Sequence, residues 1–167
     1  NVSPGRMDWR YFAHGNLLAV ILGMATPEQT QALMRLYEAR WNDLMGEMPV
    51  KISFPALQGE EWRIVTGCDP KNKPWSYHNG GNWPPLLWAF VAAATKAERQ
   101  DLAARALEQA EPRLERNLWP EYYDGRKGQL VGRHACVPHT WSVAGTLLAE
   151  KFRTGPDSVL RKLGWNH

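Results

Sequence analysis

Five helical stretches, separated by alternately short and long connections, constrain the fold of this 167-residue chain more than any other feature. Apolar residues at helical spacing predict helices over residues 8–24, 26–44, 82–96, 99–116 and 140–153. Short turns join the first helix to the second and the third to the fourth, whereas about 35 and about 20 residues separate the other neighbours. Loops this long are usually functional or disordered, and their wealth of Trp, Tyr, Gly, His and Asn does not suit disorder.

Helical hairpins whose long loops all emerge at one end are typical of an α/α toroid, which carries its functional site at that end. We therefore predict an all-α fold that forms part of an (α/α)6 toroid. A complete ring of six hairpins needs more helices than this chain supplies. Residues 1–167 are accordingly expected to be one portion of a larger ring.

Particular residues predict the helix start and the buried faces. Thr26 and Gln29 flank Pro27 as a capping box that begins the second helix. Strands are predicted at most over the short segments 51–54 and 129–131. The faces expected to be buried are Leu33, Leu36, Tyr37, Trp41 and Leu44 in the second helix, Leu102, Leu107, Ala110 and Leu114 in the fourth, and Trp141, Ala144, Leu148 and Phe152 in the last.

Charge and cysteine content argue against several classes of partner. The net charge is only +3 and basic residues alternate with acids, so no nucleic-acid partner is predicted. Two cysteines, Cys68 and Cys136, do not make a disulfide scaffold. The apolar runs 17–22 and 86–94 are too short to cross a bilayer, so no membrane partner is predicted. Since no targeting segment is visible, we expect a cytoplasmic protein.

Glu121 is the strongest candidate for a catalytic group. It lies in an aromatic loop, residues 119–125, that follows directly on a helix and ends in Gly125. A carboxylate that acts as a base needs hydrogen-bond donors to remain ionised, and Trp119, Tyr122 and Tyr123 are the expected donors. The alternative reading makes Glu121 a solvated loop acid.

A second candidate segment, residues 74–84, combines stacking rings with polar groups suited to hydroxyls. Trp75 and Trp83 offer flat faces for sugar rings, while His78 and Asn79 offer donors and acceptors. The alternative for each Trp is that it packs a loop onto a helix end. Arg63, upstream, could clamp a hydroxyl or a carboxylate, or form an ion pair with a neighbouring glutamate.

A metal site competes weakly with these interpretations. His134, Cys136 and His139 are close in sequence, and Cys68 or His78 could complete four zinc ligands. Because their spacing matches no tight ligand pattern, we predict neither a metal nor a cofactor.

At these residues the chain resembles the alkaline/neutral invertases, glycoside hydrolase family 100. The resemblance rests on long strings in one order: Gly5-Arg-Met-Asp-Trp-Arg-Tyr-Phe12, Gly59-Glu-Glu-Trp-Arg-Ile64, Asp69-Pro-Lys-Asn through Trp83-Pro84, Trp119-Pro-Glu-Tyr-Tyr-Asp-Gly125 and Thr140-Trp-Ser-Val-Ala-Gly145. It implies an (α/α)6 barrel that hydrolyses sucrose without a metal, with inversion at the glucosyl carbon and Glu121 as general base.

By this resemblance residues 1–167 are the C-terminal part of one catalytic domain, because no segment matches the Asp-Thr-Gly-aromatic string that carries the general acid. The substrate-binding residues it implies are Arg63, Trp75, His78, Asn79, Trp83, Trp119, Tyr123 and His139. His139 stands where the family has Gln, and Cys136 and Val137 replace basic residues, which puts the sugar specificity in doubt. The isolated chain is expected to be inactive and to self-associate or to pair with the missing N-terminal part. The alternative is a non-catalytic remnant that binds a sugar or a protein partner through its Trp-rich loops.

Overall fold

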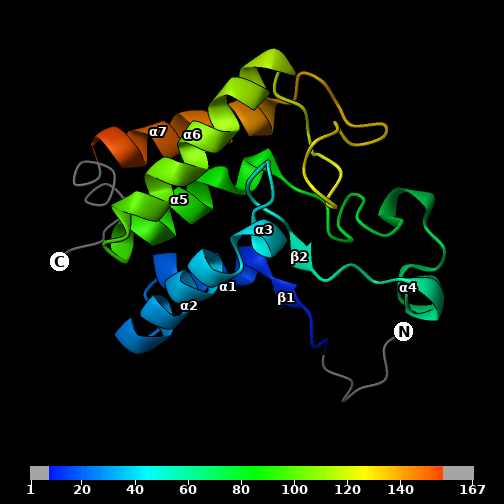
Figure 1. Ribbon diagram of the computed structural model, residues 1–167, viewed down its shortest axis with the longest axis horizontal. Helices are drawn as coiled ribbons and strands as arrows, with labels where there is room; N and C mark the ends of the chain where they lie inside the picture. The colour runs from blue at the N-terminus through cyan, green and yellow to red at the C-terminus, as the bar shows by residue number, and fades with distance from the viewer. Residues whose placement is uncertain (1–7, 156–167) are drawn as a thin grey trace.

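Helices dominate residues 8–155, the part of the chain that the computed structural model describes (Figure 1). The elements are, in order, β1 (Tyr11–Phe12), α1 (Ala13–Ile21), α2 (Pro27–Ala39), α3 (Trp41–Leu44), β2 (Ser53–Phe54), α4 (Gly59–Thr66), the 3-10 turns η1 (Pro70–Asn72) and η2 (Pro84–Leu86), α5 (Leu87–Lys96), α6 (Gln100–Arg116) and α7 (Thr140–Thr154). The predicted helical character is thereby confirmed.

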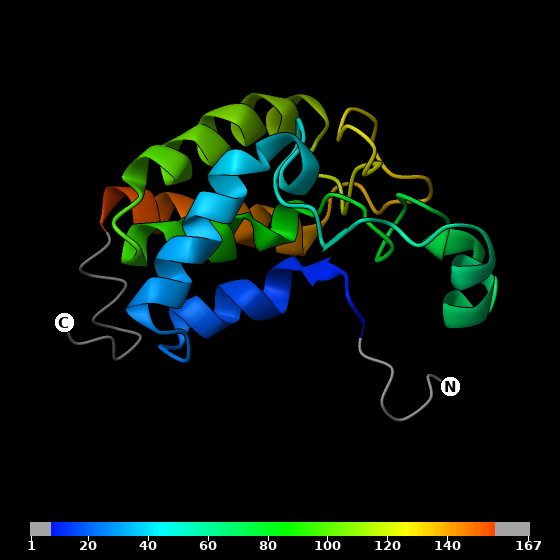
Figure 2. The same cartoon turned by 60° about the horizontal axis from the view of Figure 1, so that its bottom comes forward.

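Helix α5 forms the centre of the core. It packs against α1 on one side and against α6 and α7 on the other, and the two views of the ribbon show it enclosed by these helices (Figures 1 and 2). All but three residues of α5 are buried, four of them alanines. Because alanine side chains are short, the neighbouring helices can approach closely from several directions, which explains why α5 lacks the usual polar face.

Helix α7 packs through small residues, which corrects the predicted face. Its buried positions are Ser142, Gly145, Ala149 and Phe152. A side chain at Gly145 would lie 3.0 Å from the carbonyl oxygen of Pro85, so the helix crosses η2 with its backbone almost in contact. Of the four residues expected inside, only Phe152 is buried, whereas Trp141, Ala144 and Leu148 face outwards.

The other predicted faces agree more closely with the structure. In the fourth helix, now α6, every residue named is buried. In the second helix Tyr37, Trp41 and Leu44 are buried, although the last two belong to α3, and Leu36 is exposed. The capping box of Thr26 and Gln29 is present as predicted.

The first helix begins later than predicted, because a short pair of antiparallel strands precedes it. Tyr11 pairs with Phe54 and Phe12 with Ser53. The amide of Ala13 then donates to the carbonyl of Ile52 at 3.0 Å, so α1 can begin only at Ala13. The predicted strand over 51–54 is confirmed at its end, whereas residues 129–131 contribute only an isolated bridge between Val131 and Tyr123.

Helix α4 lies within a long connection for which the sequence analysis predicted no helix. Gly67 ends it in the left-handed conformation (φ +63°), and Glu60 and Glu61 occupy its first turn, where a helix favours negative charge. None of its residues is buried, and it projects from the helical body (Figures 1 and 2). With eight residues, it is shorter than the stretch over which helical spacing can be recognised in a sequence.

Within residues 8–155 no helix is long and apolar enough to cross a membrane. Cys68 and Cys136 are both free and exposed.

We predict a pH-dependent stability at the contact of α6 with α7. A hydrogen bond with Glu150, with burial as a second cause, raises the pKa of Glu111 to about 7, while Arg153 lowers the pKa of Glu150. Because the folded Glu111 binds its proton more tightly than the unfolded chain does, its contribution to stability is lost as the pH rises from about 4.5 to about 7. In thermal unfolding at pH 5 and pH 8, Glu111→Gln should lose less stability than the wild type. Glu115→Gln, on the same helix, should follow the wild type; equal pH slopes for both variants would contradict the assignment.

Candidate functional site

Three loops that are far apart in sequence are joined around Asn82. Its backbone exchanges two hydrogen bonds with Tyr123, at 3.0 and 2.8 Å, and its side-chain amide donates to the carbonyls of Met45 and Met48. The buried ammonium of Lys51 donates to the Asn82 side-chain oxygen at 3.2 Å and to the carbonyl of Gly125. Burial lowers the pKa of Lys51 to about 8. The joined loops form a platform at one end of the helices (Figure 1).

Glu121 lies on the extended strip that this platform holds. The Tyr122 carbonyl accepts from Gly132 at 2.8 Å, so the strip is bonded along both edges. Glu121 itself is bonded to Cys136 twice: its amide donates to the Cys136 carbonyl at 2.9 Å, and its Oε2 accepts from the Cys136 amide at 3.2 Å. Only 7% of Glu121 is exposed. The carboxylate is therefore held by the backbone of Cys136.

A lysine pairs with this carboxylate. The Nζ of Lys71 lies 3.7 Å from Glu121 Oε2 and 3.9 Å from the centre of the Tyr77 ring. Lys71 sits in η1, whose capping residue, Asp69, accepts the Lys71 amide at 2.9 Å. That bond is the main reason that the pKa of Asp69 is lowered.

His78 completes the immediate surroundings of the carboxylate. Its ring stacks on Tyr77 at 4.0 Å between centroids and lies 5.0 Å from the ring of Trp83. Burial lowers the pKa of His78, opposed by the charge of Glu121 and reinforced by that of Lys71. A half-desolvated neutral imidazole can both donate and accept a hydrogen bond, which suits a hydroxyl-rich ligand.

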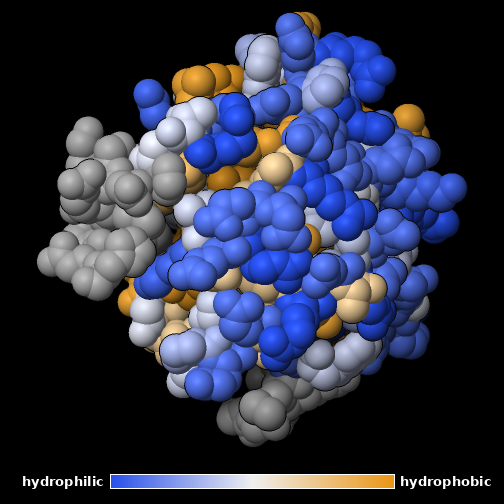
Figure 3. All heavy atoms as spheres, turned by 60° about the vertical axis from the view of Figure 1, so that its left-hand side comes forward, coloured by the Kyte–Doolittle hydropathy of each residue, from blue (hydrophilic) through white to orange (hydrophobic). Residues whose placement is uncertain are grey.

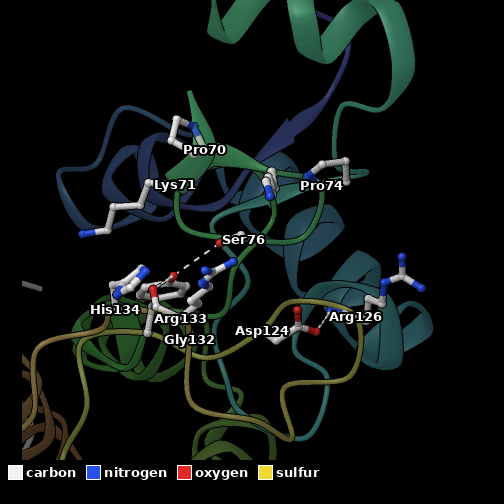
Figure 4. Close-up of a pocket in the computed structure, with 11 residues that line it drawn as sticks. Pro70, Lys71, Pro74, Ser76, Asp124, Arg126, Gly132, Arg133 and His134 are labelled. Carbon is white, nitrogen blue, oxygen red and sulfur yellow. Dashed lines mark hydrogen bonds between the residues drawn. The ribbon is translucent and has the colours of Figure 1, made fainter. Parts of the chain in front are cut away.

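A cavity of about 580 Å³ adjoins the ion pair on the side of Lys71. In Figure 4, Pro70, Lys71, Pro74 and Ser76 face the segment 124–134 across it. The Tyr122 hydroxyl connects residues on opposite sides of the cavity: it donates to the Arg133 carbonyl at 2.6 Å and lies 3.3 Å from Ser76 Oγ. The space is comparable to that of small-ligand pockets.

Comparison with known proteins identifies the family. The sequence model for "Alkaline and neutral invertase" matches residues 1–156. The chain belongs to the alkaline and neutral invertase family. It is 55% identical to "Probable alkaline/neutral invertase F" of Arabidopsis thaliana over 159 residues, 95% of this chain and 32% of that protein. It is 56% identical to "Cytosolic invertase 1" of Oryza sativa subsp. japonica, again over 95% of this chain and 28% of that protein.

The chain therefore spans about a third of the length of the curated invertases that it matches. Other matching members are named as mitochondrial or chloroplastic. Among solved structures, the chain is similar to a GH63 mannosylglycerate hydrolase from Thermus thermophilus, with a TM-score of 0.55 and 22% identity over 80% of this chain and 28% of that one. That likeness concerns the fold alone.

Several residues that the invertase resemblance assigned to the sugar are already occupied by structural contacts. The Asn79 amide is buried and bonded to both the amide and the carbonyl of Leu57, at 2.7 and 3.0 Å. Trp83 is buried, donates from Nε1 to the Tyr77 carbonyl at 2.9 Å and stacks against Tyr122. Trp75 is half-buried 5.4 Å from the Lys51 ammonium. These residues shape the platform.

Other predicted site residues lie apart from Glu121. Arg63, on exposed α4, is 3.4 Å from Glu60, which is the ion-pair alternative considered from the sequence. Trp119 borders a separate hollow with Glu111, Glu115 and Thr146. His139 precedes α7, where its Nδ1 lies 3.3 Å from Ser142 Oγ.

The donors expected for Glu121 were wrong. The Tyr122 hydroxyl bonds to Arg133, as above, and the Tyr123 hydroxyl accepts from Asn117 and donates to the Arg113 carbonyl. The actual partners are a backbone amide and Lys71, which the sequence analysis did not single out. The sequence signals only the local turn, since Asp69 followed by Pro70 is typical of a capped turn; it carries no signal for the pairing of Lys71 with Glu121.

Within residues 8–155 no three His, Cys, Asp or Glu side chains gather in a way that could hold a metal ion.

We predict that the crossing of two loops at Gly125 is indispensable to the platform. A Cβ at Gly125 would lie 1.5 Å from the carbonyl oxygen of Gly80, so Gly125→Ala forces the loops apart. We expect a loss of about 3 kcal/mol or more in the free energy of unfolding, measured by denaturant titration.

The matched control is Gly15→Ala, at an exposed position of α1 where nothing lies within 4 Å of the added carbon. It should be neutral or stabilising by about 1 kcal/mol. A Gly125→Ala variant as stable as this control would contradict the crossing.

Proposed function

We propose that this chain is the C-terminal part of the catalytic domain of a sucrose-hydrolysing glycosidase, with Glu121 as its general base. Membership of the invertase family supports the reaction class. The observation that carries the role of Glu121 is its position: a carboxylate nearly enclosed in a loop platform, bonded by one amide and paired with one ammonium, beside a cavity. A solvated loop acid, the alternative considered from the sequence, would not be buried beside a cavity in this way.

The proposed reaction inverts the glucosyl carbon. Glu121 takes a proton from a water molecule as the water oxygen attacks that carbon, and a general acid protonates the departing fructosyl oxygen. The two carboxyl groups would lie about 6.5–9.5 Å apart to leave room for the water. We assign the acid to a part of the enzyme beyond these residues. The reaction then needs neither metal nor cofactor, and His78, beside Glu121, is the chain's best-placed hydroxyl-binding group.

Backbone strain in the loops agrees with a functional platform. Within residues 8–155, seven residues other than glycine have positive φ, a conformation that costs free energy and is found preferentially at functional sites. All but Glu98 belong to the loops around Glu121 or lead into them: Cys68, Trp75, Tyr77, Leu118, Trp119 and His134.

We propose that the helices form part of an (α/α)6 toroid and that the apolar outer face of α7 packs against the rest of the polypeptide. Leu147 is 63% exposed and Trp141 49% exposed, and a hollow of about 550 Å³ runs beside Ala144, Leu147 and Leu148. Figure 3 shows apolar residues exposed among polar ones on this side of the molecule. The length of the curated invertases, about three times that of this chain, supports such a partner.

A chain that leaves this face uncovered should self-associate. In sedimentation experiments the isolated chain is expected to form dimers or larger species, and the double change Leu147→Glu with Leu148→Glu should shift it to monomer. Lys127→Glu, an exposed charge change in a loop, serves as the control. A wild-type chain that is monomeric at high concentration would oppose the assignment of this face.

We further propose a cytoplasmic enzyme, following the relative named cytosolic, although other members are named for organelles.

The test of the proposed function is the loss of sucrose hydrolysis in Glu121→Gln of the full-length enzyme at near-neutral pH. Gln preserves shape and hydrogen bonding but cannot accept the proton, so kcat should fall about 10³-fold. Glu108→Gln, an exposed acid on α6, should leave the rate unchanged. Wild-type activity in Glu121→Gln would refute the base, and a full-length protein that binds sucrose without cleaving it would favour a sugar-binding remnant.

A further inference from the structure

We propose that Lys71 is the positioning residue of Glu121: its ammonium contacts one carboxylate oxygen and leaves the other aimed at the attacking water. This inference rests on the proposed function of Glu121. Lys71 lies 50 residues before Glu121 in the chain, and only the folding of the loops brings the two side chains together.

The contacts of the carboxylate are divided unevenly between its oxygens. The Cys136 amide and the Lys71 ammonium both approach Oε2, at 3.2 and 3.7 Å. Among the described residues Oε1 has no hydrogen-bond partner. One hydrogen bond and one ion-pair contact on the same oxygen restrain the rotation of the carboxyl group and leave the other oxygen available to a water molecule. A general base needs this arrangement, because a proton can be taken only at hydrogen-bond distance.

Lys71 is itself held in place from two sides. Its backbone is fixed by the Asp69 cap of η1, and its ammonium lies over the Tyr77 ring, whose other contacts include the stacked ring of His78. An ammonium on an aromatic face is attracted electrostatically by the ring. A lysine restrained in this way loses less entropy when it pairs with a carboxylate than a free surface lysine does.

The charged neighbours decide what removal of the ammonium would do. His78 and Asp69 are the other titratable groups near the pair, and the 133–139 loop contributes the amide of Cys136, whose thiol is exposed. Among the described residues, Lys71 is the cation that forms an ion pair with Glu121. Loss of an adjacent positive charge disfavours an ionised carboxylate in general, and the experiment measures that effect.

The experiment is the pH profile of kcat/KM for sucrose in the full-length enzyme. In Lys71→Met the acidic limb should move to higher pH, and the effect should be modest because the Lys71 side chain is 37% exposed. The rate on that limb should fall about tenfold while the plateau falls less. Lys71→Arg keeps the positive charge and should restore most of the limb. Lys127→Met removes an equal charge from an exposed loop residue and should reproduce the wild-type profile.

The possible outcomes separate this inference from the proposed function. If Glu121→Gln loses activity but the limb of Lys71→Met coincides with that of the wild type, Lys71 has no positioning role. A uniform loss of rate without a shift of the limb, not restored by Arg, also overturns it, because that result indicates a role in binding or folding alone. Full activity in Glu121→Gln would contradict the proposed function itself, because it would show that Glu121 is not the general base. Lys71→Gln provides a second charge-free variant, should Met disturb the fold, and the same shift is expected.

Discussion

The hydrogen bonds of Asn82 are the constraint on which the rest of the site depends. One buried amide side chain closes the loop at Met45–Met48, and the backbone of the same residue pairs with Tyr123. Satisfied networks of buried polar groups specify a unique arrangement, since each alternative leaves a group unpaired at a cost of about 1–3 kcal/mol. Loops joined in this way need few apolar contacts to keep their shape. Glu121 lies two residues from Tyr123, so the same hydrogen bonds restrain its backbone.

The helices contribute to the candidate site indirectly, by fixing the positions from which its loops begin. The alanine-rich α5 lets α1, α6 and α7 converge, and η2, which leads into α5, places Asn82 and Trp83 at the end of that bundle. At the same end α6 delivers the chain into the strip that carries Glu121. The scaffold thus sets where the loops begin and end, while polar bonds and ring stacking set their shape. This division of labour is common where a rigid framework supports functional loops.

Periodicity and capping residues were enough to predict the main helices and to place Glu121 in a loop that opens from α6. They could not predict which face of α7 is buried. The spacing of large apolar residues favours the face of Trp141 and Leu148, whereas the helix buries Gly145 and Ala149, small residues that let its backbone approach its neighbours closely. Nor could they reveal the pairing of Lys71 with Glu121, which depends on non-local loop contacts. The sequence also could not show that the side chains of Asn79 and Trp83 make structural contacts, because a buried structural amide or indole has the same sequence signature as a binding one.

The crossing at Gly125 and Gly80 has a consequence for how such enzymes diversify. Gly80 has a φ of +88°, and a carbon atom added at Gly125 would collide with the carbonyl oxygen of Gly80, so the loop of Gly125 is fitted to the bare backbone of the loop of Gly80. Neither loop can be lengthened, grafted or recombined alone without breaking the fit. The segments 75–83 and 119–128 should therefore be exchanged between related proteins as a single cassette, and natural variation in specificity should accumulate at the loop rims, where side chains reach solvent.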